Sequence, residues 1–425
     1  MVFLGDANGR PAFTAGESHL LVLGPPRSGK TTSVIVPNLA LHKGPAVVAS
    51  TKSDVLAATQ GSRSKLGPVF IFDPSGRTKV PSGFTEVRWS PVEASCTLDA
   101  AVRTADLLVD VGLERPYGEG SHWAERAKAL LAPILLSTKL AGGTMADVVG
   151  GIDERDLVRF APVLEANDQL RALQILLGLA QTDARELSGI FSTASGSLGA
   201  YRTEAALKST ENPNFSPSAF VERPGTLYIV SPSSEQKIAA PVIVALLDQI
   251  RSSTYERYPR GAPESGQMLM CLDELANIAP LPNLASILSE GASQGVTVIG
   301  CLQDLSQARQ RWGRSASGFL TLFGTTLLLP GIADSGTLSA ISEVSGTRFR
   351  QEAQVSFAAP SILKRRSQVS MRSVETRYVA PGELAQIPRG SAMVFDWKQP
   401  PGIVRLKPIF ARRGVALGEV TRSVR

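Results

Sequence analysis

The sequence predicts an α/β fold in which a mostly parallel sheet is interrupted by an inserted all-helical domain and followed by C-terminal β elements. Three observations support this prediction. Continuous apolar strands alternate with helical segments over the first seventy residues, helical periodicity alone runs from about residue 99 to 212, and the alternation then resumes. Apolar strands separated by helices are typical of a parallel sheet that is covered on both faces.

The first elements follow one another at short spacing. Apolar runs predict strands at 20–23, 45–50 and 69–72, and the segments between them predict helices at 32–41 and 54–65. Because each strand is followed by a helix before the next strand, we expect these strands to lie parallel.

The middle of the chain has helical character. Ala- and Leu-rich stretches such as 123–140 and 170–180 predict helices, and no convincing strand pattern occurs in this region. The Pro-rich stretch 212–217 is typical of a linker. We therefore expect an inserted all-helical domain over residues 98–216.

Strand–helix alternation after this insertion completes the sheet. Strands are predicted at 226–230, 268–272, 296–301 and 325–329, and each is followed by a helix. The last eighty residues predict β-hairpin elements and a short helix near 381–387.

Composition excludes several classes of protein. The chain has 425 residues, three cysteines and no Cys-x-x-Cys or Cys/His cluster, so we expect neither a zinc site nor a disulfide framework. No run approaches the ~20 apolar residues that span a bilayer and no signal peptide is visible, so a soluble chain in a reduced cytosol is expected. The net charge of +6 is uneven, because residues 345–425 carry 15 basic and 5 acidic side chains. This basic segment indicates an anionic partner, such as nucleic acid or acidic lipid headgroups, or else a solvated surface.

The segment 20–41 combines an apolar strand, a Gly-x4-Gly-Lys-Thr loop and an apolar helix. In such a P-loop, small residues let backbone N–H groups and a helix N-terminus face phosphate oxygens. Lys30 is expected to reach the β- and γ-phosphates of ATP, and the Thr31 hydroxyl to hold Mg²⁺. A Gly/Pro-rich turn is the alternative, but the flanking strand and helix favour nucleotide binding. The predicted contacts come from Gly24, Pro25, Pro26, Arg27, Ser28, Gly29, Lys30, Thr31 and Thr32.

The apolar strand predicted at 268–272 runs directly into Asp273 and Glu274. This is the pattern of a Walker B strand. Asp273 is expected to orient the Mg²⁺ shell, and Glu274 to polarise the attacking water. The alternative is an acidic helix N-cap, but a P-loop in the same chain favours the catalytic interpretation.

The next strand ends in Gln303, which suits a γ-phosphate sensor that reports hydrolysis to the following helix. A helix N-terminal residue is the competing interpretation. Arg309, Arg311 and Arg314 lie on or just after that helix and are candidates for an arginine donated to a neighbouring subunit's transition state.

The order of P-loop, intervening strands, Asp-Glu and sensor Gln is typical of RecA-like ring ATPases. We therefore expect four segments. They are a first part of a RecA-like nucleotide-binding domain at 1–97, the all-helical insertion at 98–216, the second RecA-like part at 217–345, and a basic β-rich segment at 346–425.

Several motifs together resemble the type IV coupling proteins of the TraG/TraD/VirD type. The matching segments include GPPRSGKT, STKSD, IFDPSG, GSHWAERAKALL, IFSTASGSL, LDELANIAPLPNLASILSEG, GCLQDLSQARQRWG and VAPGELAQIPRGSAMVF, from about residue 19 to 395. LDELANI followed by LQ is much more specific than a P-loop alone.

The resemblance implies a motor that delivers DNA or relaxase–DNA complexes to a type IV secretion channel. It also implies a homo-hexameric ring with DNA in its channel, a helical insertion that reads cargo, and a place at the cytoplasmic face of the plasma membrane. Basic channel residues would contact phosphates without base specificity, and the stretch 364–366 is one suggestion for them.

The sequence departs from the family pattern in two respects. Family members usually carry a membrane anchor before the nucleotide-binding domain, whereas some twenty residues precede this P-loop, so we expect either docking on a membrane partner or a truncated start. Many relatives also place an Arg between the Walker B helix and the sensor strand, where residues 290–295 have none. The missing Arg keeps open a nucleotide-gated cargo adaptor with weak hydrolysis, and an FtsK/HerA-like translocase without a secretion channel is a further alternative.

Overall fold

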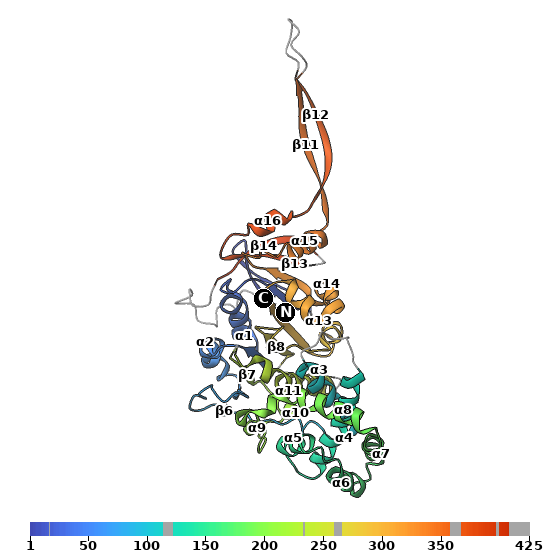
Figure 1. Cartoon of the computed structure of the whole chain (residues 1–425). Coiled ribbons are helices and arrows are strands. Elements are labelled where there is room, and N and C mark those ends of the chain that lie inside the picture. Colours follow the sequence, from blue (N-terminus) through green and yellow to red (C-terminus); the bar gives the residue numbers. More distant parts are fainter. Residues whose placement is uncertain are drawn as a thin grey trace.

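A twelve-stranded sheet forms the centre of the molecule (Figure 1). The computed structural model describes residues 1–16, 18–113, 122–232, 234–258, 266–357, 367–396 and 399–407. The strands of this sheet are β1 (Phe3–Ala7), β2 (Arg10–Phe13), β3 (His19–Leu23), β4 (Ala46–Ser50), β5 (Val69–Phe72), β6 (Thr85–Glu86), β7 (Thr226–Val230), β8 (Met268–Leu272), β9 (Val296–Leu302), β10 (Gly324–Leu328), β13 (Ser391–Asp396) and β14 (Gln399–Arg405).

The strands lie in the order β2-β1-β14-β13-β10-β3-β9-β8-β4-β7-β5-β6. Every neighbouring pair from β10 to β6 is parallel, and from β10 to β5 this is the arrangement that the alternation of strands and helices predicts. The pairs on the other side of β10 are antiparallel. The sheet is therefore mostly parallel with an antiparallel extension, and the chain is an α/β protein of RecA-like type.

Helices cover both faces of the parallel part. Residues of β3 alternate between the two sides, because Leu21 and Leu23 join one apolar core whereas Leu20 and Val22 join the other. Burial on both faces accounts for the continuous apolar strands in the sequence. The helices outside the insertion are η1 (Thr31–Ile35), α1 (Val36–Leu41), α2 (Asp54–Arg63), α11 (Gln236–Arg257), α12 (Leu284–Glu290), α13 (Leu305–Trp312), η5 (Gly313–Gly318), α14 (Phe319–Phe323), α15 (Ser335–Val344) and α16 (Pro381–Ala385).

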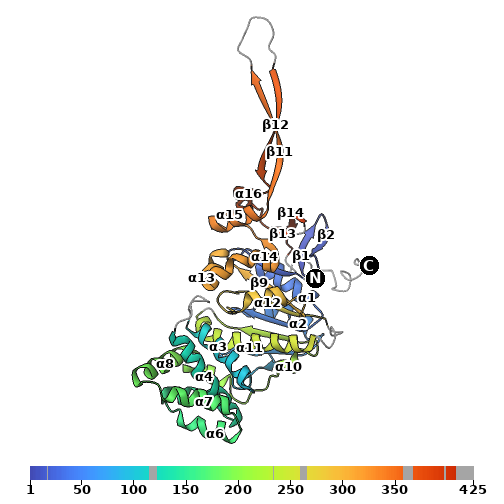
Figure 2. The same ribbon diagram turned by 90° about the vertical axis from the view of Figure 1, so that its right-hand side faces the viewer.

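Among its described residues, the segment between β6 and β7 contains helices joined by turns and loops, and no strand. Its helices are α3 (Leu98–Gly112), α4 (His122–Leu140), α5 (Met145–Asp153), η2 (Val158–Phe160), α6 (Ala161–Ala166), α7 (Leu170–Ala180), α8 (Ala184–Ser197), η3 (Gly199–Arg202), α9 (Glu204–Lys208) and α10 (Pro217–Phe220). Helix α3 joins this group to the body by packing against α11 (Figure 2). Gly112 permits the close approach of α3 to α8, because a Cβ there would lie 2.2 Å from the Ser197 carbonyl oxygen.

A second sheet consists of β11 (Thr347–Phe357) and β12 (Ser367–Arg377). This hairpin projects from the side of the body that carries α15 and α16, away from the helical group (Figures 1 and 2). The β elements expected after residue 345 are therefore β11 to β14, and the short helix expected at 381–387 is α16.

Two details differ from the sequence predictions. Strands β1, β2 and β6 were not predicted, and the helix expected at 32–41 begins as the π-helix η1. Pro37 accounts for the second difference, since a proline ring crowds the carbonyl four residues earlier and favours a wider turn before it.

No helix in the described ranges is both long enough and apolar enough to cross a bilayer.

Candidate nucleotide site

Four strand ends meet at one edge of the sheet. Strands β3, β9, β8 and β4 are parallel neighbours in that order, so their carboxyl ends lie side by side. The segments that follow them begin with Gly24, Gln303, Asp273 and Thr51. The topology thus brings together the P-loop, the proposed sensor and the two acidic residues. Ligands of open α/β sheets bind outside such carboxyl ends.

The loop after β3 has a backbone that requires glycine at two positions. A Cβ at Gly24 would lie 2.6 Å from Ser28 Oγ and 2.9 Å from Leu329 Cβ, and Gly29 has a φ of +98°. Arg27 also adopts a left-handed φ of +63° while its side chain is exposed. The loop is held by a hydrogen bond from Gly24 N to Leu302 O at 3.1 Å. It is therefore a preformed concave loop at the start of a helix, as phosphate binding needs.

Lys30 folds back over this loop. Its Nζ donates to Pro25 O at 3.1 Å and to the carbonyl oxygen of Gly24. The ammonium group therefore lies over the loop, where it is positioned to interact with a phosphate. Pro26 is exposed, whereas Ser28 and Thr32 are partly buried.

The P-loop contacts the acidic strand end through one hydroxyl. Thr31 Oγ1 donates to the Asp273 carboxylate at 3.0 and 3.1 Å. Ser50, the last residue of β4, donates from Oγ to Asp273 Oδ2 at 3.0 Å. The backbone N–H of Asp273 donates to Ala49 O at 2.9 Å, which fixes the start of the acidic segment against β4. Two hydroxyls, one at the start of η1 and one at the end of β4, therefore orient this carboxylate.

Burial raises the pKa of Asp273 above its ordinary value, although the hydroxyls of Thr31 and Ser50 and the nearby Lys30 favour the carboxylate. A carboxylate beside two hydroxyl oxygens is a set of hard oxygen ligands, which suits Mg²⁺. The described residues contain no cluster of three or more His, Cys, Asp or Glu that could hold a metal ion, so the oxygen ligands offered here are one carboxylate and two hydroxyls.

Glu274 lies next to Asp273 and is partly buried. Its Oε1 accepts a hydrogen bond from Asn277 Nδ2 at 2.9 Å. Burial raises the pKa of Glu274, Lys30 opposes that shift, and the neighbouring Asp273 adds to it. A carboxylate with a raised pKa is a stronger base for a water proton than an exposed glutamate.

Gln303 follows β9, and β9 lies between the P-loop strand and the acidic strand. Its backbone N–H donates to Gln307 Oε1 at 2.8 Å, and Asp304 caps the next helix by accepting from Ser306 N at 2.9 Å. The helix cap is therefore Asp304, which leaves the Gln303 side chain, partly buried, at the strand end.

The three arginine candidates lie on α13 and η5, which follow Gln303 in the chain. Arg309 is exposed and helps to lower the pKa of Asp334, after the larger effect of the hydrogen bond from Thr337. Arg314 is exposed, and Arg311 is partly buried. A role toward a neighbouring subunit stays a prediction for all three. The basic stretch 364–366 lies outside the described residues.

Sequence reasoning missed Ser50 and Asn277. Both lie in motifs that are visible in the sequence, STKSD and LDELANI. The partner of Ser50 follows from the position of β4 beside β8, and the partner of Asn277 follows from the turn after β8.

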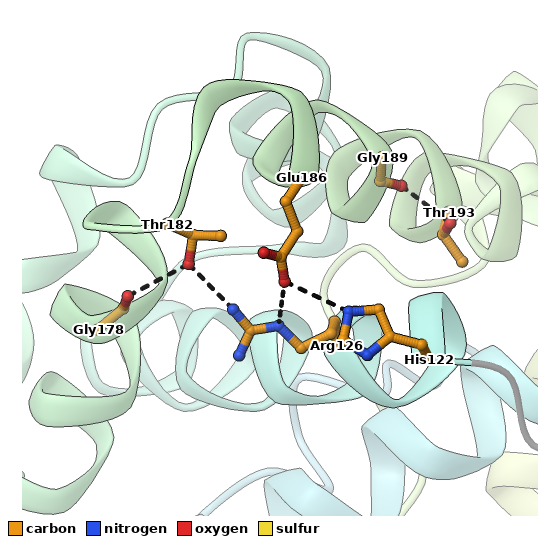
Figure 3. Close-up of polar contacts among 7 residues, drawn as sticks. All are labelled: His122, Arg126, Gly178, Thr182, Glu186, Gly189 and Thr193. Atoms are coloured by element: carbon orange, nitrogen blue, oxygen red, sulfur yellow. Dashed lines mark hydrogen bonds and ion pairs between the residues drawn. The ribbon is translucent and has the colours of Figure 1, made fainter.

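The helical segment contains a polar cluster of its own (Figure 3). His122 Nε2 and Arg126 Nε, both on α4, lie 3.3 and 3.2 Å from Glu186 Oε1 on α8. Arg126 also donates to Thr182 Oγ1 at 2.9 Å. The motif GSHWAERAKALL therefore supplies contacts that join two helices of the insertion, far from the P-loop edge.

Comparisons with known proteins identify a family whose model matches most of the chain. The model of a family described as "Type IV secretory system Conjugative DNA transfer" matches residues 2–413. The conjugal transfer protein TraG of Escherichia coli is 25% identical over 333 residues, which cover 70% of this chain and 50% of the relative. Protein VirD4 of Rhizobium rhizogenes is 23% identical over 400 residues, covering 91% of this chain and 58% of the relative. The chain thus spans between about half and three fifths of the length of these curated relatives.

Solved structures of a coupling protein share the fold. The unbound bacterial conjugative coupling protein TrwB superposes with a TM-score of 0.71 at 22% identity, over 95% of this chain and 88% of that one. The plasmid coupling protein TrwB in complex with ADP and Mg²⁺ gives a TM-score of 0.69 at 22% identity, with the same coverage.

Proposed function

The chain belongs to the type IV secretory system conjugative DNA transfer family, and we propose that it is an ATP-driven coupling protein. In this proposal it recruits DNA or relaxase–DNA complexes and pumps them into a type IV secretion channel. The observation that carries the proposal is the contact of Thr31 with Asp273, which joins the P-loop to the acidic strand end. Such a pairing of a P-loop hydroxyl with an acidic strand end belongs to nucleotide hydrolysis.

The proposed nucleotide site is the loop from Gly24 to Thr32, with Pro25, Pro26, Arg27, Ser28 and Gly29 between them. Its backbone N–H groups would face the phosphates of ATP, and Lys30 would exchange its loop carbonyls for phosphate oxygens. Thr31 and Asp273 would hold Mg²⁺, and the bound ion would neutralise charge that develops on the phosphates. Ser50 would keep the Asp273 carboxylate in place.

Glu274 is the proposed base that positions a water for attack, because it follows Asp273 and its carboxylate is oriented by Asn277. Gln303 is the proposed sensor, because its strand lies between β3 and β8. Arg309, Arg311 and Arg314 stay candidates for an arginine that acts on a neighbouring copy.

The assembly proposed from the family is a homo-hexameric ring that contacts DNA without sequence preference. Residues 1–97 and 217–345 would form its RecA-like motor, residues 98–216 would read the cargo, and residues 346–425 would add a basic, β-rich part. We place it at the cytoplasmic face of the plasma membrane, next to the secretion channel.

An FtsK/HerA-like translocase without a channel would use the same motor on other DNA, but the helical insertion and LDELANI favour the coupling protein. A nucleotide-gated adaptor that binds cargo but turns over slowly is favoured by the lack of an Arg at 290–295.

DNA binding tests the nucleic-acid part of the proposal. Fluorescence anisotropy with single- and double-stranded oligonucleotides of unrelated sequence would be measured between 50 and 200 mM salt. We expect affinities that are equal across sequences and that fall by about tenfold or more over this range. Binding that is sequence-specific, or that ignores salt, would contradict it.

A further inference from the structure

The β11–β12 hairpin forms a sheet of its own. Its strands pair without a register shift from Thr347 opposite Arg377 to Phe357 opposite Ser367. In both views the hairpin stands clear of the body (Figures 1 and 2). Among residues 347–353 and 371–377, whose side chains the structure describes, none belongs to either apolar core of the body.

The foot of the hairpin is held in a defined direction. Tyr378 N donates to Gly346 O at 2.8 Å, which extends the ladder by one step, and Ser342 Oγ of α15 donates to Val379 O at 2.7 Å. The Arg348 guanidinium lies over the Tyr378 ring at 5.2 Å. These contacts link the hairpin to α15, so its position follows that of the body.

The outer edges of the hairpin carry backbone N–H and C=O groups that could pair with a further strand. Among the described residues, neither outer edge of the two strands has a further strand beside it. Phe349 and Met371 are 76% and 64% exposed. A two-stranded sheet is marginally stable in water, and free strand edges are templates for pairing with another chain.

We propose that this hairpin is a contact between copies of the chain, in which β12 of one copy pairs with β11 of the next. The inference rests on the proposed ring. Within each hairpin β11 runs away from the body and β12 runs back toward it. If several copies are arranged around an axis parallel to their hairpins, β12 of one copy lies beside β11 of the next, and these two strands are antiparallel. The contact joins two different edges, so it is heterologous and repeats from copy to copy.

The charges along the hairpin fit this arrangement. If neighbouring copies are not shifted along the axis, each residue of β12 lies opposite the residue of the next β11 that has the same number as its partner within its own hairpin. Those pairs include Glu352 opposite Arg372, and between 347–353 and 371–377 no pair joins two like charges. Opposite charges across strands stabilise pairing, and like charges oppose it. A second copy would therefore pair with the backbone groups of the strand edge and place side chains of opposite charge across from each other.

Site-directed crosslinking tests the contact in the full chain. Glu352→Cys and Arg372→Cys would be made separately in a Cys96→Ser background, since Cys96 is exposed whereas Cys271 and Cys301 are buried. We expect a crosslinked dimer, by oxidation or with a short bismaleimide, only when the two variants are mixed. Val344→Cys mixed with Glu352→Cys is the control, because Val344 is 67% exposed but lies at the foot.

Charge reversal gives a second readout. Glu352→Arg or Arg372→Glu alone should shift sedimentation toward the monomer, and the two together should restore the assembly of the wild type. Glu343→Arg, an equal charge change at an exposed residue of α15, should leave assembly unchanged.

The outcomes separate the inference from the proposed function. An assembled wild type that gives no mixed crosslink, or that crosslinks from one variant alone, overturns the hairpin contact and leaves the motor proposal standing. A chain that stays monomeric with nucleotide and DNA at every concentration overturns both the contact and the ring. Binding of anionic vesicles that depends on Phe349 and Met371, without a mixed crosslink, would assign the hairpin to a membrane surface instead.

Discussion

Thr31 and Asp273 are 242 residues apart in the chain, and their side chains meet at 3.0 and 3.1 Å. Between them in sequence lie the whole helical insertion and the five strands β4 to β8. The contact forms because β3 and β8 are each parallel neighbours of β9, which places their carboxyl ends at the same edge. The phosphate-binding loop and the acidic residues therefore form one site.

Removal of the Lys30 amine should weaken nucleotide binding. Lys30→Ala loses the charged donor that lies over the loop, and hydrogen bonds to charged groups are worth about 1.5–3 kcal/mol, or about tenfold to a hundredfold in affinity. Titration with a fluorescent ATP analogue measures the loss. Lys43→Ala, an exposed lysine before β4, is the control and should bind as the wild type does. Equal affinities for the two variants would remove Lys30 from the site.

Loss of the Glu274 carboxylate should separate binding from turnover. Glu274→Gln keeps the size and the contact with Asn277 but removes the base, so turnover should fall by about a hundredfold to ten-thousandfold while ATP affinity is retained. Steady-state hydrolysis and equilibrium binding would be measured on the same preparation. Glu290→Gln, at the exposed end of α12, is the matched control. Comparable hydrolysis by Glu274→Gln and the wild type would refute the assignment.

Ser50 should act through Asp273. Ser50→Ala removes one of the two hydroxyl donors to the partly buried Asp273 carboxylate, so the Mg²⁺ concentration for half-maximal hydrolysis should rise by about tenfold or more. Ser50→Thr keeps a hydroxyl and should recover much of the loss. Ser231→Ala is the control, because Ser231 is fully buried at the end of the neighbouring strand β7 and makes no contact with Asp273 that the structure records. An unchanged Mg²⁺ dependence in Ser50→Ala would restrict Ser50 to a structural role.

Protonation of His19 should lower the free energy of unfolding at acidic pH. Its Nδ1 accepts from Val298 N at 3.0 Å, and burial at 2% exposure lowers its pKa from 6.5 to about 4. The folded chain therefore favours neutral His19. Its contribution is fully present above pH 6.5 and is lost as the pH falls toward 4, up to about 3 kcal/mol.

Urea unfolding at several pH values measures this effect. His42 is partly buried and its pKa is also lowered to about 4, so the wild type alone does not isolate His19. His19→Gln keeps an acceptor without the titration, and its unfolding free energy should fall less steeply below pH 6.5 than that of the wild type. Parallel curves would show that His19 does not titrate in this range.

The sequence predicts the parallel sheet well because its strands are buried on both faces. Strands β3, β4, β7 and β8 consist wholly of buried residues, and their apolar runs coincide with the predicted strands to within one residue. Such strands can be recognised from the local sequence alone, because the side chains on both faces must be apolar.

The antiparallel extension was not predictable from local pattern. Gly5 interrupts β1 with a φ of +137°, and the partner of Asp6 is Arg405, at the far end of the chain. Asn38 of α1 holds β1 through hydrogen bonds to Phe3 N and Phe3 O at 2.7 and 2.9 Å. The information for β1 is therefore distributed over distant residues.

The candidate site divides in the same way. Lys30, Asp273 and Glu274 follow from motifs that have a strand on one side, whereas Ser50 gains its meaning only when β4 is known to lie beside β8. The strand order decides which hydroxyl reaches which carboxylate, and the residues around Ser50 do not encode it.

The most direct test of the proposed motor is ATP hydrolysis by the purified chain, with and without DNA, across a salt series and with Glu274→Gln as the blank. We expect turnover that DNA stimulates and that salt suppresses in parallel with DNA binding. ATP binding without turnover under every DNA condition would contradict the motor and favour the adaptor.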